Sequence, residues 1–368
     1  MNLIDYFNPV PFSITPKKGY VSNQWTFLSE ELSHTLKLKQ YPLALFSVNT
    51  QKNSNYTSEI RKLLYRLTSH TPKPYKAIDL GEIKNGTSFS DTLFAVRDVV
   101  EYLTENKTIP IIISDNSYIP YSIYLAYEAQ KKFVNMAVSD FSVKIKKSNN
   151  HYLPQILSRK ENTLFNYILL GHQNYFTLPS ELSMMQSLYF EGLRLGELQK
   201  DITMAEPYLR DSDIFCLHDT AIINTYLPEY ENISPNGLSI KECCQLAMYA
   251  GFSDRLSAFS ILYNQETSIN ALAMAQIIWH FIDGYTARKH DYPASPVSKL
   301  KRIHVEVSQK TYITFYKSTK SSRWWMEIPI PKSDFQKKWL ISCSEADYTQ
   351  ACNGNIPDKW LHAYQKLL

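Results

Sequence analysis

Several short apolar runs of this chain are followed by side chains that could bind a metal ion or move a proton. The run Ile214–Leu217 is followed directly by an imidazole, a carboxylate and a hydroxyl, and imidazole and carboxylate groups serve as metal ligands and as general bases. Three other runs end in similar polar residues. The complete set is Asp115, Asn116, Ser117, Asp140, Ser142, Lys144, His218, Asp219, Thr220 and Tyr263.

Ligands of an open parallel sheet sit outside the carboxyl ends of its strands, so these residues need such a sheet to bring them together. Apolar runs alternate with longer amphipathic segments along the chain, which predicts a parallel sheet with helices on both faces. The predicted strands are Pro42–Val48, Pro110–Ser114, Val134–Ser139, Tyr167–Leu170, Ile214–Leu217, Phe259–Leu262 and Tyr312–Tyr316.

Helical spacing of apolar residues marks the segments between these strands. One helix is predicted to begin at an N-cap at Ser90, with Asp91 in its first turn. A second is predicted from about Ser268 to Asp283, with Gly284 as its stop. The segment Ser180–Lys200 has one apolar helical face, but a glycine on that face argues against an unbroken helix.

Composition excludes several classes of protein. The 368 residues are 44% hydrophobic, and the net charge of +4 is too small and too evenly spread for a nucleic-acid-binding protein. No apolar stretch approaches the roughly 20 residues that cross a bilayer, and no signal peptide is expected at the N-terminus. Five cysteines without metal-binding spacing predict neither disulfides nor a zinc site, which favours a cytoplasmic location.

Seven stretches spread over nearly the whole chain carry a family resemblance. They are Asp79–Gly81, Ser90–Thr92, Pro235–Leu238, Tyr249–Asp254, Ala275–Tyr285, Phe315–Ser318 and Arg323–Pro329. In these stretches the sequence resembles the ureohydrolase family of arginase, agmatinase and formimidoylglutamase, and within it the formimidoylglutamase-like branch typical of Bacteroidetes. The resemblance implies a three-layer α-β-α fold of the arginase type with a mostly parallel central sheet.

That fold predicts three regions in the chain. Residues 1–35 would form an N-terminal extension and residues 36–295 the ureohydrolase-like α/β domain. Residues 296–368 would add a strand and a Trp-rich extension packed on the same domain. Trp324 and Trp325 lie in this extension and would face opposite sides of an extended segment. They would either brace the parent domain or contribute to an interface with another protein.

Active ureohydrolases are understood to bind two manganese ions, and the resemblance assigns each ligand position a residue here. The first histidine ligand falls on Ser117. The Asp-x-His-x-Asp motif falls on Asp140, Ser142 and Lys144, and the later Asp-x-Asp motif on His218 and Thr220, or on Asp219 after a slip of one residue. The substrate-side glutamate falls on Tyr263.

This replacement pattern predicts that the chain binds no manganese and has no catalytic residue. Two divalent cations need several anionic ligands, and a fixed ammonium would repel them. We therefore expect Lys144 to pair with Asp140 or Asp219 as a counter-ion in place of the metals. His218 remains open as a lone metal ligand, a general base or a structural residue.

Other conspicuous residues have two interpretations each. Cys216 or the pair Cys243-Cys244 could supply a nucleophile, but cysteine in a helical pattern usually acts as a small apolar residue. The stretch His172–Tyr175 follows a strand and would either line the pocket or form a hydrogen-bonded loop.

Three functions follow from this pattern. The leading hypothesis is a catalytically inactive ureohydrolase homologue without cofactor that acts as a structural protein or binds a protein partner, a second copy of itself included. The first alternative is a hydrolase of non-peptide C–N bonds in linear amidines with an altered metal site. The second alternative is a metal-free ligand sensor that keeps the pocket.

Overall fold

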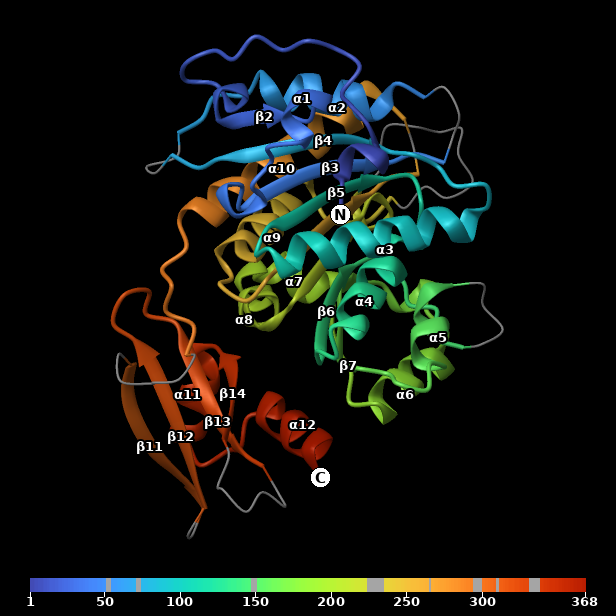
Figure 1. Ribbon diagram of the computed structural model, residues 1–368. Helices are drawn as coiled ribbons and strands as arrows, with labels where there is room; N and C mark the ends of the chain where they lie inside the picture. Colours follow the sequence, from blue (N-terminus) through green and yellow to red (C-terminus); the bar gives the residue numbers. More distant parts are fainter. Residues whose placement is uncertain are drawn as a thin grey trace.

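A computed structural model gives the fold of the chain. The described residues are 1–50, 54–70, 74–146, 151–223, 235–264, 266–293, 300–308, 311–330 and 338–368. Within them the main body contains a ten-stranded sheet in the order β1-β4-β3-β5-β10-β9-β6-β7-β8, with β2 also paired to β4 (Figure 1). Only the pairing of β1 with β4 is antiparallel. The strands are β1 (Phe7–Asn8), β2 (Trp25–Phe27), β3 (Leu43–Val48), β4 (Ala77–Ile83), β5 (Ile109–Ser114), β6 (Val134–Ser139), β7 (Leu164–His172), β8 (Glu191–Arg194), β9 (Ile214–His218) and β10 (Ala258–Leu262).

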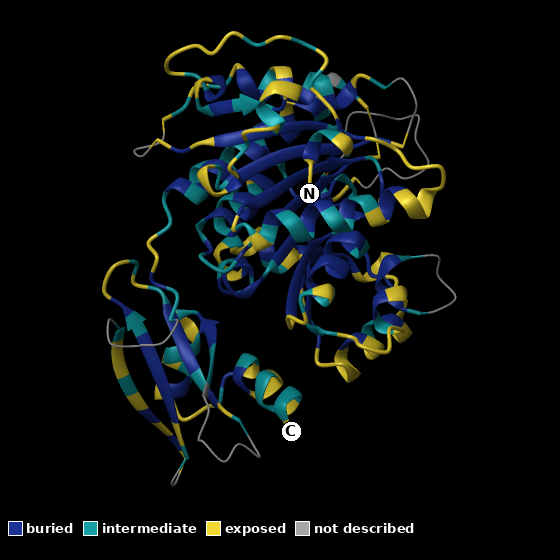
Figure 2. Cartoon of the chain, viewed as in Figure 1, coloured by how far each residue is buried: buried dark blue, intermediate teal, exposed yellow. Residues whose placement is uncertain are grey.

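The central strands are buried on both faces, as Figure 2 shows by their dark blue colour. Every residue of β3, β5, β6, β9 and β10 is buried, which explains why these segments read as continuous apolar runs. One face carries a core with residues of α2, α9 and α10, and the other a core with residues of α3, α4 and α5. The main body is therefore the predicted three-layer α-β-α arrangement with a mostly parallel sheet.

The helices follow the strands in the order of a doubly covered sheet. They are α1 (Glu30–Ser33), α2 (Tyr56–Tyr65), α3 (Phe89–Glu105), α4 (Ile119–Ala129), α5 (Tyr152–Leu157), α6 (Pro179–Ser187), α7 (Leu195–Lys200), α8 (Glu206–Asp211), α9 (Ile240–Phe252) and α10 (Ser268–Thr286). Short 3-10 turns join them, namely η1 (Leu3–Asp5), η2 (Val21–Gln24), η3 (Leu38–Gln40), η4 (Asn174–Phe176), η5 (Ile202–Ala205) and η6 (Asp219–Ala221).

Two helix ends differ from the prediction. Helix α3 begins two residues earlier than expected, because Ser88 rather than Ser90 caps it, in a reciprocal capping box with Asp91. Gly284 does not stop α10 but lies inside it. A Cβ atom there would lie 2.3 Å from the carbonyl oxygen of Met248 in α9, so the glycine is needed where the two helices approach each other closely.

The segment Ser180–Lys200 is not one helix. Helix α6 ends before β8, which contains Gly192, and α7 follows. A Cβ atom on Gly192 would lie 3.1 Å from the ring of His172 in β7. The glycine that lowers helix propensity thus sits in a short edge strand packed against its neighbour.

Strand β4 holds a buried ion pair that the apolar pattern did not reveal. The Asp79 carboxylate is fully buried and accepts hydrogen bonds from Arg61 Nε at 2.9 Å, the Tyr65 hydroxyl at 2.5 Å and the backbone N–H of Gly81 at 2.9 Å. Arg61 also donates to the carbonyl oxygen of Gly81 and the hydroxyl of Ser47. Because both charges are hydrogen-bonded, their burial is tolerated.

The chain after residue 300 forms a second sheet, with strands in the order β11-β12-β13-β14, all antiparallel (Figure 1). Its elements are β11 (Leu300–Ser308), β12 (Thr311–Ser318), β13 (Trp324–Pro329), β14 (Lys338–Cys343), α11 (Glu345–Cys352) and α12 (Asp358–Leu367). The predicted strand Tyr312–Tyr316 is therefore real but belongs to this sheet and not to the central one. The small sheet has its own apolar core.

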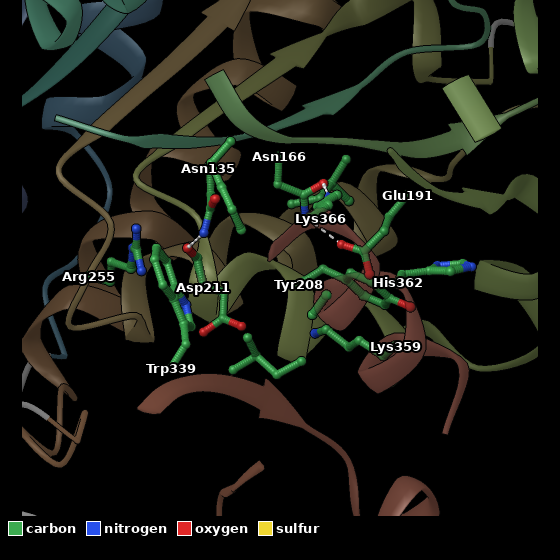
Figure 3. Close-up of a pocket in the computed structure, with 14 residues that line it drawn as sticks. Asn135, Asn166, Glu191, Tyr208, Asp211, Arg255, Trp339, Lys359, His362 and Lys366 are labelled. Atoms are coloured by element: carbon green, nitrogen blue, oxygen red, sulfur yellow. Dashed lines mark hydrogen bonds between the residues drawn. The ribbon is translucent and has the colours of Figure 1, made fainter. Parts of the chain in front are cut away.

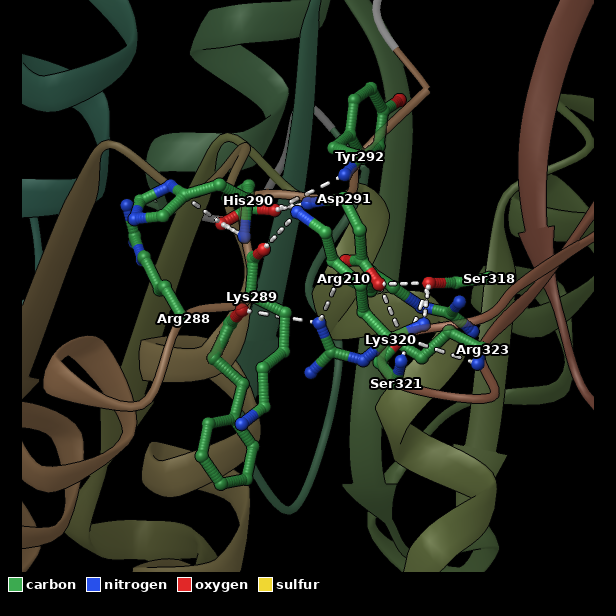
Figure 4. Close-up of polar contacts among 12 residues, drawn as sticks. Arg210, Arg288, Lys289, His290, Asp291, Tyr292, Ser318, Lys320, Ser321 and Arg323 are labelled. Atoms are coloured by element: carbon green, nitrogen blue, oxygen red, sulfur yellow. Dashed lines mark hydrogen bonds and ion pairs between the residues drawn. The ribbon is translucent and has the colours of Figure 1, made fainter. Parts of the chain in front are cut away.

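Polar contacts hold this sheet against the main body (Figure 4). Buried Arg210 of α8 donates to the carbonyl oxygens of Trp324 and Cys343 at 3.0 and 2.9 Å. Arg323 pairs with Glu206 at 3.0 Å, and the carboxylate of Asp291 accepts hydrogen bonds from the hydroxyls of Ser318, at the end of β12, and Ser321, just after it. Within the part of the chain described, no helix is both long enough and apolar enough to span a bilayer.

Candidate site at the carboxyl ends of the strands

The residues after β6 and β9 form the centre of the candidate site. Asp140 follows β6, and its Oδ1 accepts hydrogen bonds from the Thr220 hydroxyl and the Phe141 N–H, both at 2.7 Å. Its Oδ2 lies 4.0 Å from Nδ1 of His218, the last residue of β9. The predicted residues Asp140, His218 and Thr220 are thus brought together because β6 and β9 are parallel neighbours.

The carboxylate of Asp219 faces the adjacent strand instead. It accepts hydrogen bonds from the backbone N–H of Asn264 at 2.6 Å and from the Asn264 side-chain amide at 2.8 Å. Asn264 directly follows Tyr263 at the end of β10. This carboxylate therefore ties two strand ends together.

The residues after β5 are arranged in the same manner. Asp115 accepts hydrogen bonds from the backbone N–H of Thr50 at 2.9 and 3.0 Å and from its hydroxyl at 2.7 Å. Asn116 is buried and caps the turn into α4 by accepting from the N–H of Tyr118 at 2.8 Å. Ser117 is exposed. Ser117, which the resemblance assigns to the first histidine ligand, therefore lies at the surface.

Lys144 is exposed and not a counter-ion of the site. Among the residues that the structure describes, it makes no ion pair with a carboxylate, and Asp140 is satisfied by Thr220 and Phe141 instead. The expected pairing of Lys144 with Asp140 or Asp219 is therefore wrong. The reason is that β6 ends at Ser139 and the chain turns away, so that Ser142 is buried while Lys144 lies at the surface.

Tyr263 lies on the opposite face of the sheet from His218. It is buried, its ring packs against Tyr56 of α2 with ring centroids 4.7 Å apart, and burial raises the pKa of its hydroxyl. The hydroxyls of Tyr56 and Tyr263 have no hydrogen-bond partner among the described residues. Tyr263, which the resemblance places at the family's substrate-side glutamate, therefore presents a buried aromatic ring at this position.

His218 and the nearby His151 are held neutral by desolvation. Desolvation lowers the pKa of His218, against an opposing effect of Asp140. Desolvation also lowers the pKa of His151, to about 3, and the charges of His218 and Lys144 lower it further. His151 caps α5 by accepting from the N–H of Leu153 at 3.4 Å. Both imidazoles are therefore uncharged near pH 7.

These side chains do not fit a dinuclear manganese site. Within the described residues no group of three or more histidine, cysteine, aspartate or glutamate side chains converges as metal ligands would. The carboxylates of Asp115, Asp140 and Asp219 are already hydrogen-bonded to protein donors, and His218 Nδ1 lies 4.0 Å from the Asp140 carboxylate. Two hard divalent cations would need several more oxygen ligands.

Trp324 and Trp325 are buried within the chain, so neither indole is exposed to a partner, contrary to one of the two predictions. As expected for neighbours on a strand, they face opposite sides. Trp324 stacks on Tyr348 of α11 at 4.5 Å, whereas Trp325 lies under the guanidinium of Arg210 at 4.7 Å. The pair braces the small sheet against the main body.

The cysteines lie away from this edge or are sealed in the core. Cys216 is fully buried in β9, and burial raises the pKa of its thiol to about 12. Cys243 and Cys244 are buried in α9, where burial also raises both thiol pKa values. Because the thiolate is the nucleophile, these thiols are unreactive at neutral pH. His172 is buried, and burial lowers its pKa.

Comparisons with known proteins address the fold. No family model matches the sequence, and a sequence comparison with curated proteins finds no match. Solved structures do match. The formimidoylglutamase of Bacillus subtilis superposes with a TM-score of 0.57 at 15% identity, over 67% of this chain and 88% of that one. The formiminoglutamase of Trypanosoma cruzi with Mn2+ gives a TM-score of 0.60 at 13% identity, over 68% and 96%.

The agmatine ureohydrolase of Thermoplasma volcanium matches over 74% of this chain and 95% of its own, with a TM-score of 0.54 at 14% identity. At such identities the likeness establishes the fold. The chain has the arginase-like α/β fold, and the solved structures that share it include formimidoylglutamases and an agmatine ureohydrolase.

Proposed function

We propose that this chain is a catalytically inactive member of the ureohydrolase family, in the formimidoylglutamase-like branch, and that it acts by binding another protein in the cytoplasm. The observation that carries the proposal is the state of the carboxylates at the strand ends. Asp115, Asp140 and Asp219 each accept short hydrogen bonds from protein donors. These donors already occupy lone pairs on all three carboxylates that a pair of cations would need as ligands.

An activity assay tests the loss of chemistry. The purified chain with added Mn2+ is expected to release no product from formiminoglutamate, arginine or agmatine, while an active formiminoglutamase run in parallel turns over its substrate. Turnover that depends on Mn2+ would refute the proposal and support the alternative, a linear-amidine hydrolase with an altered metal site.

An exposed apolar surface supports the partner-binding part of the proposal. Six large apolar side chains between 37 and 67% exposed lie on or next to η4 and α6, namely Tyr175, Phe176, Leu178, Met184, Leu188 and Tyr189. We call them the α6 surface. Clusters of this kind on a folded protein are typical of interaction sites. A second copy of this chain is the first partner to test.

Sedimentation velocity distinguishes self-association from its absence. If the α6 surface binds a second copy, Leu178→Glu shifts the chain toward the monomer, whereas Tyr312→Glu, at an exposed aromatic on β12, leaves the distribution unchanged. A wild-type chain that remains monomeric at all concentrations would exclude self-association and leave a different protein as the partner.

A metal-free ligand sensor is the second candidate, and unpartnered buried atoms at the same edge favour it. His218 Nε2 and Asn116 Nδ2 are buried and have no hydrogen-bond partner among the described residues. Stabilisation of the chain by an amidine or amino acid without metal, lost in His218→Phe, would support this function.

A further inference from the structure

A small polar cavity lies at the opposite end of the central sheet from the residues discussed so far. Asn135, Asn166 and Glu191 stand near the starts of β6, β7 and β8, and β14 and α12 of the small sheet close the space over them (Figure 3). The centre of a water molecule can occupy a volume of about 30 Å³ inside this cavity. That is room for about two waters, or for a solute of about four or five non-hydrogen atoms.

Most polar groups around this cavity satisfy one another. The Asp211 carboxylate accepts hydrogen bonds from the N–H and hydroxyl of Ser342. The side-chain amide of Asn166 donates to Glu191, and Lys366 donates to the Asn166 oxygen. Arg255 is paired with Asp213, behind the cavity wall. These groups form the wall and have little capacity left for a ligand.

Two buried atoms of the wall are left without a hydrogen-bond partner among the described residues. One is a hydrogen-bond donor and the other an acceptor. Lys359 Nζ is a cationic donor that lies over the ring of Tyr208 at 4.1 Å. Asn135 Oδ1 is a neutral acceptor on a residue only 6% exposed. The orientation of the Asn135 amide is fixed, because its nitrogen donates to the carbonyl oxygen of Asp211 at 2.9 Å.

Charged side chains of both signs line the cavity. Burial lowers the pKa of Lys366 to about 8, Glu191 opposes that shift, and Lys359 adds to it. The two ammonium groups therefore lie close enough to repel each other, and the carboxylates of Glu191 and Asp211, which also line the cavity, offset their charge. A buried ammonium without an anion or acceptor beside it is unfavourable.

We propose that this cavity binds a small carboxylate that also carries an N–H or O–H donor, of the amino-acid or hydroxy-acid class. Its carboxylate accepts a charge-assisted hydrogen bond from Lys359, and its donor group binds Asn135 Oδ1. The wall restricts the ligand to the size of glycine or glycolate. His362 of α12 is exposed at the rim and marks the side from which a solute enters.

Calorimetry on the full chain tests the site with glycine, glycolate, acetate and glutamate. We expect glycine or glycolate to bind, acetate to bind more weakly because it lacks the second donor, and glutamate not to bind because it is too large. Lys359→Met should weaken binding at least about tenfold, since a charged hydrogen bond is lost. Lys301→Met, at an exposed lysine of β11, is the matched control and should bind as wild type.

Lys359→Met removes an unpartnered buried charge, so the variant should fold with a thermal midpoint no lower than that of the wild type, and Lys359→Gln provides a second, polar variant. The proposal is overturned if neither glycine nor glycolate binds at up to about 10 mM, with water alone filling the cavity. Equal affinity in wild type and both Lys359 variants would overturn it as well. Neither result depends on manganese, so the proposed loss of catalysis is tested separately.

Discussion

The half-buried imidazole of His151 should make the chain lose stability in mild acid. Its pKa is about 3 in the folded chain against an ordinary value of 6.5, because burial disfavours the charged form. Between these two pKa values the imidazole is therefore protonated in the unfolded chain and neutral in the folded chain. Stability is fully present above about pH 6.5 and is lost as the pH falls toward the folded pKa.

The size of this loss follows from the two pKa values. Between about pH 7 and pH 5 the unfolded histidine becomes protonated while His151 in the folded chain stays neutral, which lowers the free energy of unfolding by about 2 kcal/mol. His218 has a pKa shifted in the same direction and adds to the loss. Protonation would also remove the lone pair by which His151 Nδ1 accepts from Leu153 and caps α5.

Urea unfolding followed by far-UV circular dichroism measures the effect at both pH values. His151→Asn keeps a cap acceptor but cannot be protonated, so its loss of stability from about pH 7 to pH 5 should be smaller than that of wild type by about 2 kcal/mol. His34→Asn, at an exposed histidine, should follow the wild type. An identical pH dependence in wild type and His151→Asn would refute the reasoning.

Two further changes test the core around β4, and urea unfolding measures both. Arg61→Met leaves its carboxylate partner buried and unpaired and should lower the free energy of unfolding by about 3–5 kcal/mol. Arg97→Met, in a partly exposed pair, should lower it by less than about 1 kcal/mol, and equal losses in the two variants would contradict the account. Gly81→Ala places a Cβ atom 2.1 Å from a backbone oxygen of β1 at a φ of +88°, and should cost about 2 kcal/mol or more. Gly19→Ala, at a φ of +87° with open space around it, isolates the backbone strain alone, so an equal cost in both variants would show that the clash is absent.

The strands of the central sheet could be predicted because burial on both faces leaves continuous apolar runs. Reliance on continuous apolar runs also explains two wrong predictions, one about β4 and one about the strand Tyr312–Tyr316. Asp79 and Gly81 interrupt the apolar run of β4, and the buried arginine that neutralises Asp79 lies on a helix 18 residues earlier, so the strand was missed. The run at Tyr312–Tyr316 gave a correct strand, but an apolar run does not specify which sheet the strand joins.

The sequence was sufficient to predict which residues of the candidate site follow each strand. Parallel neighbours bring Asp140 and Thr220 together, as strand order requires. Their hydrogen-bond partners were harder to predict, because Thr50 and Asn264 are contributed by other strand ends. Thr50 follows the strand β3 and could have been found by the rule that identified the others. The exposure of Lys144 depends on the course of the chain after Ser139, which no spacing encodes.

The absence of a dinuclear manganese site is the central claim of this account. Inductively coupled plasma mass spectrometry on the untagged chain, dialysed against excess Mn2+ and then against buffer, measures it most directly. The carboxylates already engaged by Thr50, Thr220 and Asn264 predict a manganese content near zero. Two equivalents of manganese per chain would contradict the account and would mean that these hydrogen bonds give way to metal ligation.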